Sequence, residues 1–350
     1  MFTRRLFLAL ALATGLAAPA AAQAFPVTVE HIYGTTTIPA QPLRVVSVGM
    51  HEQDFLYALG IAPVGVKEWW GEHPYATWPW AEAARQAVGA EPEVMDTSGV
   101  NLEWVLAQDP DLIIGIYVTM DEALYGELSK IAPTVVTPAG YQPWGAPWQA
   151  ELRIIDQATS GTTEKADAII AGFDARYAEA RAEFPQLAGK TGTNIYIREE
   201  GGFTAWSQDD LASKFLIDLG LTFPPELQAL AQADNRIDIS EENMRLLDMD
   251  VAIWPIEDAA NGERAKVEAM PLYQNLNLAK QGRSLWLDDG KGLAYAAMSW
   301  QTPLSLGYLL DILPPALAAA IDGDIEHRGS SAAGRVTHAR SLHHHRLPRT

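Results

Sequence analysis

Short apolar segments alternate with amphipathic stretches along most of the chain. Before residue 140 the apolar runs occupy 45–48, 63–66, 111–117 and 134–138, and after residue 190 a similar series occupies 194–198, 252–255 and 284–288. Helical or loop patterns separate the members of each series. This β-α-β-α order is typical of strands that pair in parallel and are covered by helices. The pattern therefore predicts an α/β fold with two Rossmann-like lobes, each built on a mostly parallel sheet.

One long amphipathic segment lies between the two series. In residues 162–184 the apolar side chains recur at spacings of three and four: Ala166, Ile169, Ile170, Phe173, Tyr177, Ala180 and Phe184. This spacing places them on one face of a helix, which would span about 34 Å. We predict one long helix that joins the lobes, fixes the angle between them and allows only small closure on ligand binding. An ordinary surface helix of the first lobe is the alternative.

The two ends of the chain differ from its body. Arg4 and Arg5 precede an apolar stretch, and Ala22-Gln23-Ala24 is a typical cleavage site, which together predict a signal peptide that is cleaved after Ala24. The paired arginines resemble a twin-arginine signal, with a Sec signal as the alternative. The expected division is residues 1–24 for the signal peptide, 25–161 for the N-terminal α/β lobe, 162–186 for the connecting helix, 187–324 for the C-terminal α/β lobe and 325–350 for a tail.

The tail holds five of the eight histidines and shows no apolar periodicity. We expect it to be disordered, and a metal-scavenging histidine segment is the alternative. The chain contains no cysteine, so it has no disulfides, no thiolate metal site and no cysteine for lipidation after the signal. The mature protein should therefore be free in the periplasm. We recognise no second apolar stretch of about 18 residues and expect no direct membrane insertion.

The body of the chain is strongly acidic. The whole chain carries −19; Arg4 and Arg5 belong to the signal, and the tail has five arginines against Glu326, so residues 25–324 carry −25. A surface with this charge repels nucleic acid and anionic lipid, which excludes both as expected partners. It also disfavours polyanionic ligands unless arginines gather locally.

One phrase of the sequence occurs twice. NLEWVLAQDPDLII begins at residue 101, and SEENMRLLDMDVAI begins at residue 240. Asn101 and Ser240 are good N-cap residues. Glu103 and Glu242 then lie at the second helical position, near free N–H groups and the positive end of the helix dipole. Capping chemistry explains each glutamate locally, whereas repetition of the whole phrase indicates two lobes of similar topology.

The order of these segments resembles a known family. NLEWVLAQDPDLIIG following RVVSVG and LYALGIAPVGV is similar to the periplasmic substrate-binding proteins of iron–siderophore ABC importers, which also include cobalamin- and haem-binding members. The resemblance extends from HIYGT at residue 31 to LLD at residue 309. The segments EWWGEHPYATWPW, GYQPWGAPWQ and MSWQTP are most similar to those of the ferric-siderophore binders.

This resemblance implies a function and partners. The protein would be a monomer and not an enzyme, and it would capture a ferric siderophore between its lobes and deliver it to the permease dimer of an ABC importer. Iron arrives already chelated, so no cofactor and no metal ligands of the protein are needed. By motif, Glu103 and Glu242 would contact arginines of the permease, with Glu241 as the alternative to Glu242.

Ligands of open α/β sheets bind outside the carboxyl ends of the strands. Large aromatic residues and one arginine gather at such positions and form the predicted ligand site: Trp69, Trp70, Tyr117, Tyr141, Trp144, Arg198, Trp206, Tyr295 and Trp300. Aromatic walls suit a bulky, partly apolar ligand, and arginine can bond carboxylate or hydroxamate oxygens. Core packing under a loop is the alternative for each aromatic residue. The acidic body favours a hydroxamate or mixed-ligand siderophore over an anionic catecholate.

Other functions are compatible with parts of the sequence. Haem or cobalamin would suit the same fold, with His51, His73, Tyr117 or Tyr141 available as axial ligands of haem. Direct capture of a transition metal needs three or four converging ligands, but the body has only three histidines. A hydrolase is the remaining alternative, although the sequence has no Gly-x-Ser-x-Gly, Gly-rich phosphate loop or His-Glu-x-x-His motif.

Overall fold

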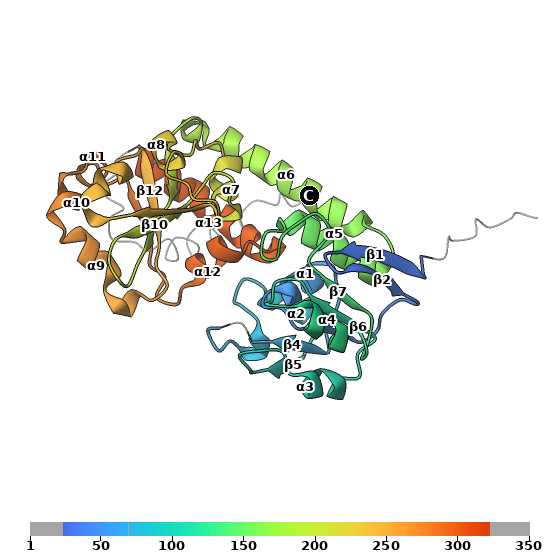
Figure 1. The fold of residues 1–350 in the computed structure, drawn as a ribbon. Coiled ribbons are helices and arrows are strands. Elements are labelled where there is room, and N and C mark those ends of the chain that lie inside the picture. Colours follow the sequence, from blue (N-terminus) through green and yellow to red (C-terminus); the bar gives the residue numbers. More distant parts are fainter. Residues whose placement is uncertain (1–23, 69, 323–350) are drawn as a thin grey trace, which may run out of the picture.

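The computed structural model of the protein describes residues 24–68 and 70–322. Two α/β lobes lie at either end of the long helix α6 (Glu164–Glu183), as Figure 1 shows. The predicted fold class, with two lobes joined by one long helix, is confirmed. The predicted signal peptide up to residue 23, Trp69 and the predicted tail lie outside the described residues.

The N-terminal lobe is built on a five-stranded parallel sheet with the order β5-β4-β3-β6-β7. Its strands are β3 (Val45–Ser47), β4 (Gly65–Lys67), β5 (Glu93–Met95), β6 (Leu112–Gly115) and β7 (Thr134–Val136), preceded by an antiparallel hairpin of β1 (Val27–His31) and β2 (Gly34–Ile38). Its helices are α1 (Glu52–Ala58), η1 (Pro74–Ala76), α2 (Glu82–Ala87), α3 (Leu102–Ala107), α4 (Glu122–Leu128) and α5 (Trp148–Ser160). The central strands are continuous apolar runs because both faces of a parallel sheet are covered.

The C-terminal lobe combines two kinds of sheet. A parallel sheet has the order β13-β12-β8, and an antiparallel sheet has the order β11-β10-β9. The strands are β8 (Gly192–Asn194), β9 (Tyr196–Ile197), β10 (Phe203–Trp206), β11 (Arg236–Ile239), β12 (Val251–Pro255) and β13 (Ser284–Leu287). The helices are η2 (Pro185–Leu187), α7 (Leu211–Asp218), α8 (Pro225–Gln228), η3 (Glu241–Leu247), η4 (Ala259–Asn261), α9 (Glu263–Glu268), α10 (Pro271–Asn275), α11 (Asn277–Lys280), α12 (Leu293–Trp300) and α13 (Pro303–Ile321).

The antiparallel sheet was not indicated by the sequence pattern. The segment 194–198, expected to be one strand, is divided between β8 and β9. The chain then reverses into β10 through Gly201 and Gly202, whose φ angles are +96° and +78°. Glycine adopts this left-handed backbone without steric cost, so the reversal depends on the pair of glycines.

The two lobes share a continuous apolar core along α6. Phe173 packs edge-on against Trp148 of the first lobe, with ring centroids 5.2 Å apart. One helical turn later, Tyr177 packs against Phe215 of the second lobe, at 5.8 Å. Neighbouring positions on one helix face therefore contact different lobes, which supports a nearly fixed angle between them.

The helix α13 forms a second connection between the lobes. Its N-cap residue, Thr302, donates a hydrogen bond of 2.7 Å to buried Asp54 in α1. Among the described residues α13 is the one helix that is long and apolar enough, by length and composition alone, to cross a membrane, so the sequence does contain a second such stretch. Leu306, Leu309 and Leu313 have no exposed surface, and core packing accounts for the apolar composition of the helix.

The repeated phrase has a structural counterpart in each lobe. Asp111 accepts hydrogen bonds from the backbone N–H groups of Leu43 and Arg44, just before β3, at 2.8 Å each. Asp250 accepts one from the N–H of Thr191, just before β8, at 2.9 Å. In both lobes the aspartate precedes a strand, β6 or β12, and binds the parallel strand beside it.

The two helix starts of the phrase differ. Asn101 caps α3 as predicted, because its side chain accepts a hydrogen bond from the N–H of Trp104 at 3.0 Å. Ser240 lies at the N-cap position of the 3₁₀ helix η3, as predicted, but its side chain makes no capping hydrogen bond. Its hydroxyl instead lies 3.1 Å from the side-chain amide of Asn243.

Candidate functional site

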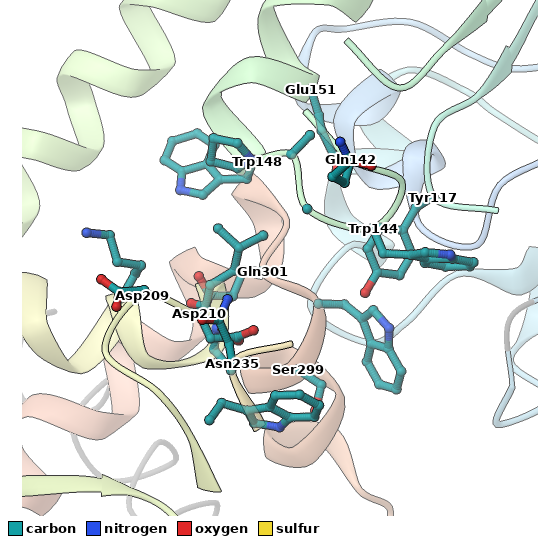
Figure 2. A pocket seen from close by; sticks show the side chains of 18 of the residues that line it. Tyr117, Gln142, Trp144, Trp148, Glu151, Asp209, Asp210, Asn235, Ser299 and Gln301 are labelled. Carbon is teal, nitrogen blue, oxygen red and sulfur yellow. The ribbon is translucent and has the colours of Figure 1, made fainter. Parts of the chain in front are cut away.

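A cleft of about 890 Å³ lies between the two lobes (Figure 2). The N-terminal lobe lines it with the turn after β3, the loop after β6 and most of the segment 142–151. Tyr177 of α6, residues from β9, β10, β11, α7 and α12, and the loops beside these elements complete the lining. Its size and its many aromatic side chains suit a small organic ligand.

The wall from the N-terminal lobe is aromatic. Tyr117 and Trp144 meet edge to face with ring centroids 4.5 Å apart, and Trp148 continues the wall at the start of α5. Trp144 is 38% exposed, and its backbone is left-handed with φ of +68°. A residue other than glycine in this conformation carries strain of about 1–3 kcal/mol. Surrounding contacts must therefore hold Trp144 in place.

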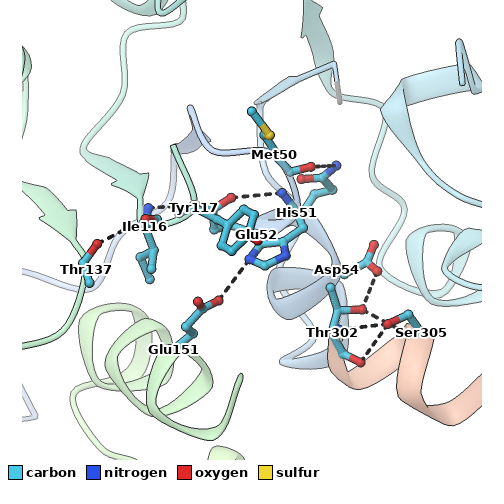
Figure 3. Close-up of polar contacts among 11 residues, drawn as sticks. Met50, His51, Glu52, Asp54, Ile116, Tyr117, Thr137, Glu151, Thr302 and Ser305 are labelled. Carbon is cyan, nitrogen blue, oxygen red and sulfur yellow. Dashed lines mark hydrogen bonds and ion pairs between the residues drawn. The ribbon is translucent and has the colours of Figure 1, made fainter. Parts of the chain in front are cut away.

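A buried ion pair lies behind this wall. His51 Nε2 and Glu151 Oε2 are 3.0 Å apart, and both residues are 2% exposed (Figure 3). The His51 ring lies against the Tyr117 ring at 4.3 Å. Burial acts to lower the pKa of His51, but Glu151, Glu52 and Asp54 together raise that pKa above its ordinary value. Burial raises the pKa of Glu151.

A second buried carboxylate fixes the turn between β3 and α1. Glu52 Oε1 accepts hydrogen bonds from the N–H groups of Ile116 and Tyr117 at 2.7 Å each, and Oε2 accepts one from the N–H of His51 at 3.1 Å. The carboxylate folds over Gly49, where a Cβ atom would lie 1.8 Å from Oε1. Glycine is required there for the Glu52 side chain to reach these donors. The bonds fix the backbone of Tyr117 relative to His51.

The wall from the C-terminal lobe is also aromatic. Tyr295 lies 5.8 Å from Tyr196 and 6.2 Å from Trp300, measured between ring centroids, and Trp206 lines the same wall. Burial raises the pKa of Tyr196, and it raises that of Tyr295 to about 12. Both phenols are therefore neutral at pH 7 and can donate hydrogen bonds to a ligand.

The charged groups of this second wall are mostly acidic. They are Asp209, Asp210, Lys214, Asp218, Asp234 and Arg236. Asp210 caps α7 by accepting a hydrogen bond from the N–H of Ala212, and burial raises its pKa. Arg236 pairs with Asp238 at 2.8 Å. Four carboxylates thus face two cations, and the cleft has no excess of positive charge.

Five of the nine predicted ligand-site residues line the cleft: Tyr117, Trp144, Trp206, Tyr295 and Trp300. Trp70 and Tyr141 are not among the lining residues. The Trp70 ring lies 6.3 Å from that of Tyr295, so it packs between the lobes, while Tyr141 is 37% exposed on the loop before α5. Trp69 lies outside the described residues.

Arg198 also does not line the cleft. Its guanidinium pairs with Glu200 at 3.0 Å and with Asp238 at 3.1 Å. These bonds hold the turn between β9 and β10, so the charge expected to meet a ligand meets neighbouring carboxylates instead. Sequence reasoning missed Glu151 and Trp148, which lie on the first turn of α5 and line the cleft. Trp148 belongs to the segment GYQPWGAPWQ, which could have indicated it, whereas Glu151 lies outside that segment.

The remaining candidates, His73, Glu103 and Glu242, do not line the cleft. Within residues 24–68 and 70–322, no group of three or more histidine, aspartate or glutamate side chains is arranged to hold a metal ion. His73 lies against Trp78 at 4.4 Å and does not line the cleft. Glu103 and Glu242 are exposed, on α3 and η3.

Comparison with known proteins finds similar chains. Residues 45–289 match a family described as periplasmic binding protein. The probable siderophore-binding lipoprotein YfiY of Bacillus subtilis (strain 168) is 28% identical over 273 residues, which cover 75% of this chain and 80% of that protein. A periplasmic solute binding protein from Mycobacterium smegmatis is similar in structure, with a TM-score of 0.74, 32% identity and coverage of 84% and 98%. PiaA of Streptococcus pneumoniae TIGR4 in complex with ferrichrome has a TM-score of 0.71, 26% identity and coverage of 85% and 99%.

Proposed function

The chain belongs to the periplasmic binding protein family, and we propose that it captures a ferric siderophore in the interlobe cleft and delivers it to the permease of an ABC importer. The observation that carries this proposal is the cleft of about 890 Å³, walled by aromatic residues of both lobes. The relative YfiY is named as siderophore-binding, and the PiaA structure holds ferrichrome. The family is one of substrate-binding proteins of transport, not of enzymes.

The charge of the cleft favours a ligand that is neutral or cationic. Its acidic groups outnumber its cations, and Arg236 is already paired with Asp238. A ferric catecholate carries several negative charges and would need an excess of cations. We therefore expect a ferric hydroxamate or a mixed-ligand siderophore.

Titration of the purified protein tests the ligand class. Ferrioxamine B, ferrichrome and a ferric catecholate would be added separately while the tryptophan fluorescence is followed, since Trp144, Trp206 and Trp300 line the cleft. We expect saturable quenching by at least one hydroxamate. Tight binding of the catecholate alone would overturn the charge argument, and a Soret band on adding haem would favour haem as the ligand.

A pair of matched variants tests the place of binding. Trp144→Ala should weaken binding by at least about tenfold, because a large aromatic residue in the wall of a binding site contributes strongly to affinity. Tyr141 lies on the same loop and is equally exposed, but it does not line the cleft. Tyr141→Ala should therefore bind nearly as well as the wild type, and equal losses in both variants would contradict the proposed site.

The permease contact is proposed for Glu103 and Glu242. Both are exposed acidic residues in the first turn of a helix, one in each lobe. Two ion pairs on a rigid body would set the docking orientation more than the affinity. Glu103→Arg/Glu242→Arg should bind the siderophore normally but fail to support growth on it as iron source. Glu122→Arg/Glu226→Arg changes the same charge at first-turn positions of α4 and α8 and should support growth.

The mature protein is proposed to be a monomer, free in the periplasm, with lobes at 25–161 and 187–324 joined by the helix segment 162–186. The absence of cysteine supports a chain without a lipid anchor. Intact-mass measurement of protein from the periplasmic fraction tests the cleavage after Ala24, and native mass spectrometry of the same sample tests the monomeric state. An additional lipid mass or an uncleaved signal would contradict the proposal.

A further inference from the structure

We propose that the His51–Glu151 ion pair is a positioning element of the ligand site, which raises ligand affinity by holding the aromatic wall of Tyr117 and Trp144. The inference rests on the proposed function for the choice of ligand. Neither residue is exposed enough to contact much of a ligand, because each is 2% exposed at the bottom of the cleft.

The pair joins three separate segments that form the wall. His51 follows β3 and precedes α1, while Glu151 is on the first turn of α5. The Tyr117 ring lies 4.3 Å from that of His51, and the Trp144 ring lies 4.5 Å from that of Tyr117. The loop that carries Trp144 runs directly into α5, where Glu151 lies. The 3.0 Å contact between His51 and Glu151 therefore connects the start of α5 to the residue against which the Tyr117 ring packs (Figure 3).

Trp144 depends on such support. Its left-handed backbone, with φ of +68°, is unfavourable for tryptophan, and its side chain is more than one-third exposed. Without a fixed Tyr117 ring and a fixed start of α5, the loop can relax to a more favourable backbone. Trp144 would then no longer face the ligand.

The stability of the fold alone does not explain why a buried ion pair lies at this position. A buried ion pair is often no more stabilising than apolar residues of the same volume, because both charges lose hydration. The groups that face His51 are Glu52 and Asp54 from α1, Glu151 from α5 and Tyr117 from the loop after β6. These carboxylates keep His51 protonated to a higher pH than an ordinary histidine. The ion pair should weaken as the pH rises through this raised pKa and His51 loses its charge.

The experiment compares Glu151→Ala with the conservative Glu151→Gln. The Kd values for ferrioxamine B and ferrichrome would be measured between pH 6 and 9, at a temperature well below the Tm of every variant. At pH 6 we expect Glu151→Ala to bind at least about tenfold more weakly, and Glu151→Gln, which keeps a hydrogen bond to His51, to stay within about threefold of the wild type. The wild-type affinity should decline as the pH rises through the raised pKa of His51, and the affinity of Glu151→Gln should change less over the same range.

A purely structural role would give a different result. Both variants would then lower the Tm while the folded protein bound ligand with an unchanged Kd and an unchanged pH profile, and this outcome would overturn the proposal. Equal loss of affinity in Glu151→Ala and Glu151→Gln would do the same. The exposed Glu122→Gln serves as the control for loss of one negative charge.

A measurement without ligand separates this inference from the proposed function. Acrylamide quenching of Trp144, taken as the difference from a Trp144→Phe background, should increase in Glu151→Ala and not in Glu151→Gln. If the wild type binds no siderophore but this difference is found, the proposed function fails and the positioning role stands. If the wild type binds siderophore and the difference is absent, the positioning role fails.

Discussion

Replacing Phe173 with alanine should loosen the attachment of the first lobe to α6. Phe173 is almost fully buried and packs edge-on against Trp148 at 5.2 Å. Truncation of a buried phenylalanine costs about 3–5 kcal/mol, and the lost aromatic pair accounts for about 0.5–1.5 kcal/mol of such a change. Because Phe173 retains slight exposure, we expect the free energy of unfolding to fall by about 4 kcal/mol.

The manner of unfolding should change as well. Tyr177, one turn further along α6, still packs against Phe215 of the second lobe in this variant. The first lobe should therefore unfold at lower urea concentration than the second, so that circular dichroism and tryptophan fluorescence give transitions that no longer coincide. Leu106→Ala is the control: Leu106 is 62% exposed, and its truncation should change stability by less than about 0.5 kcal/mol. A loss below about 1 kcal/mol with coincident transitions would refute a shared core along α6.

Three further predictions concern stability, each measured by urea unfolding. Gly49→Ala should cost about 3 kcal/mol or more, because its Cβ would displace the Glu52 carboxylate from three N–H donors; a loss below about 1 kcal/mol would contradict this. Asp111→Ala and Asp250→Ala should each cost about 1–2 kcal/mol, since the first frees two backbone N–H donors and the second frees one, beside a neighbouring strand. A neutral result in either lobe would count against equivalent roles for the two aspartates. The pKa of Tyr295 is raised from 10 to about 12, so the stability that its neutral phenol contributes is complete below pH 10 and is lost as the pH rises to 12. The free energy of unfolding of Tyr295→Phe should fall less steeply than that of the wild type between pH 10 and pH 12, and an equally steep fall would exclude this contribution.

Elements whose signal is local could be predicted from the sequence. The apolar face of α6 was evident because Ala166, Ile170, Phe173 and Tyr177 recur with the helical period, and all four are buried. Four of the five strands of the first-lobe sheet were evident as apolar runs because a parallel sheet is covered on both faces. The edge strand β5 begins with the exposed Glu93 and was not predicted, and neither was the hairpin of β1 and β2. The observed bounds of the four predicted strands differ from the predicted ones by a few residues at the ends, where side-chain pattern changes gradually.

Features that depend on distant partners could not be predicted. Arg198 stands at the end of a strand, as a ligand contact would, but its charge is taken up by Asp238 on a strand forty residues away. Glu151 carries no sequence signal, because its importance comes from His51, one hundred residues earlier. Residue type and position limit what a side chain can do, whereas its partner is decided by the tertiary fold.

The repeated phrase separates into a part that the fold explains and a part that it does not. Asp111 and Asp250 each bind the strand beside them, so the topology of either lobe benefits from an aspartate there. The side chains of Glu103 and Glu242 make no hydrogen bond or ion pair within residues 24–68 and 70–322. A favourable helix dipole is worth only about 0.3–1 kcal/mol, which permits a glutamate without requiring it at the same place on an α-helix and a 3₁₀ helix. One partner that contacts both lobes would require both glutamates, and this is the physical reason to propose the permease contact for them while the ligand is assigned to the cleft.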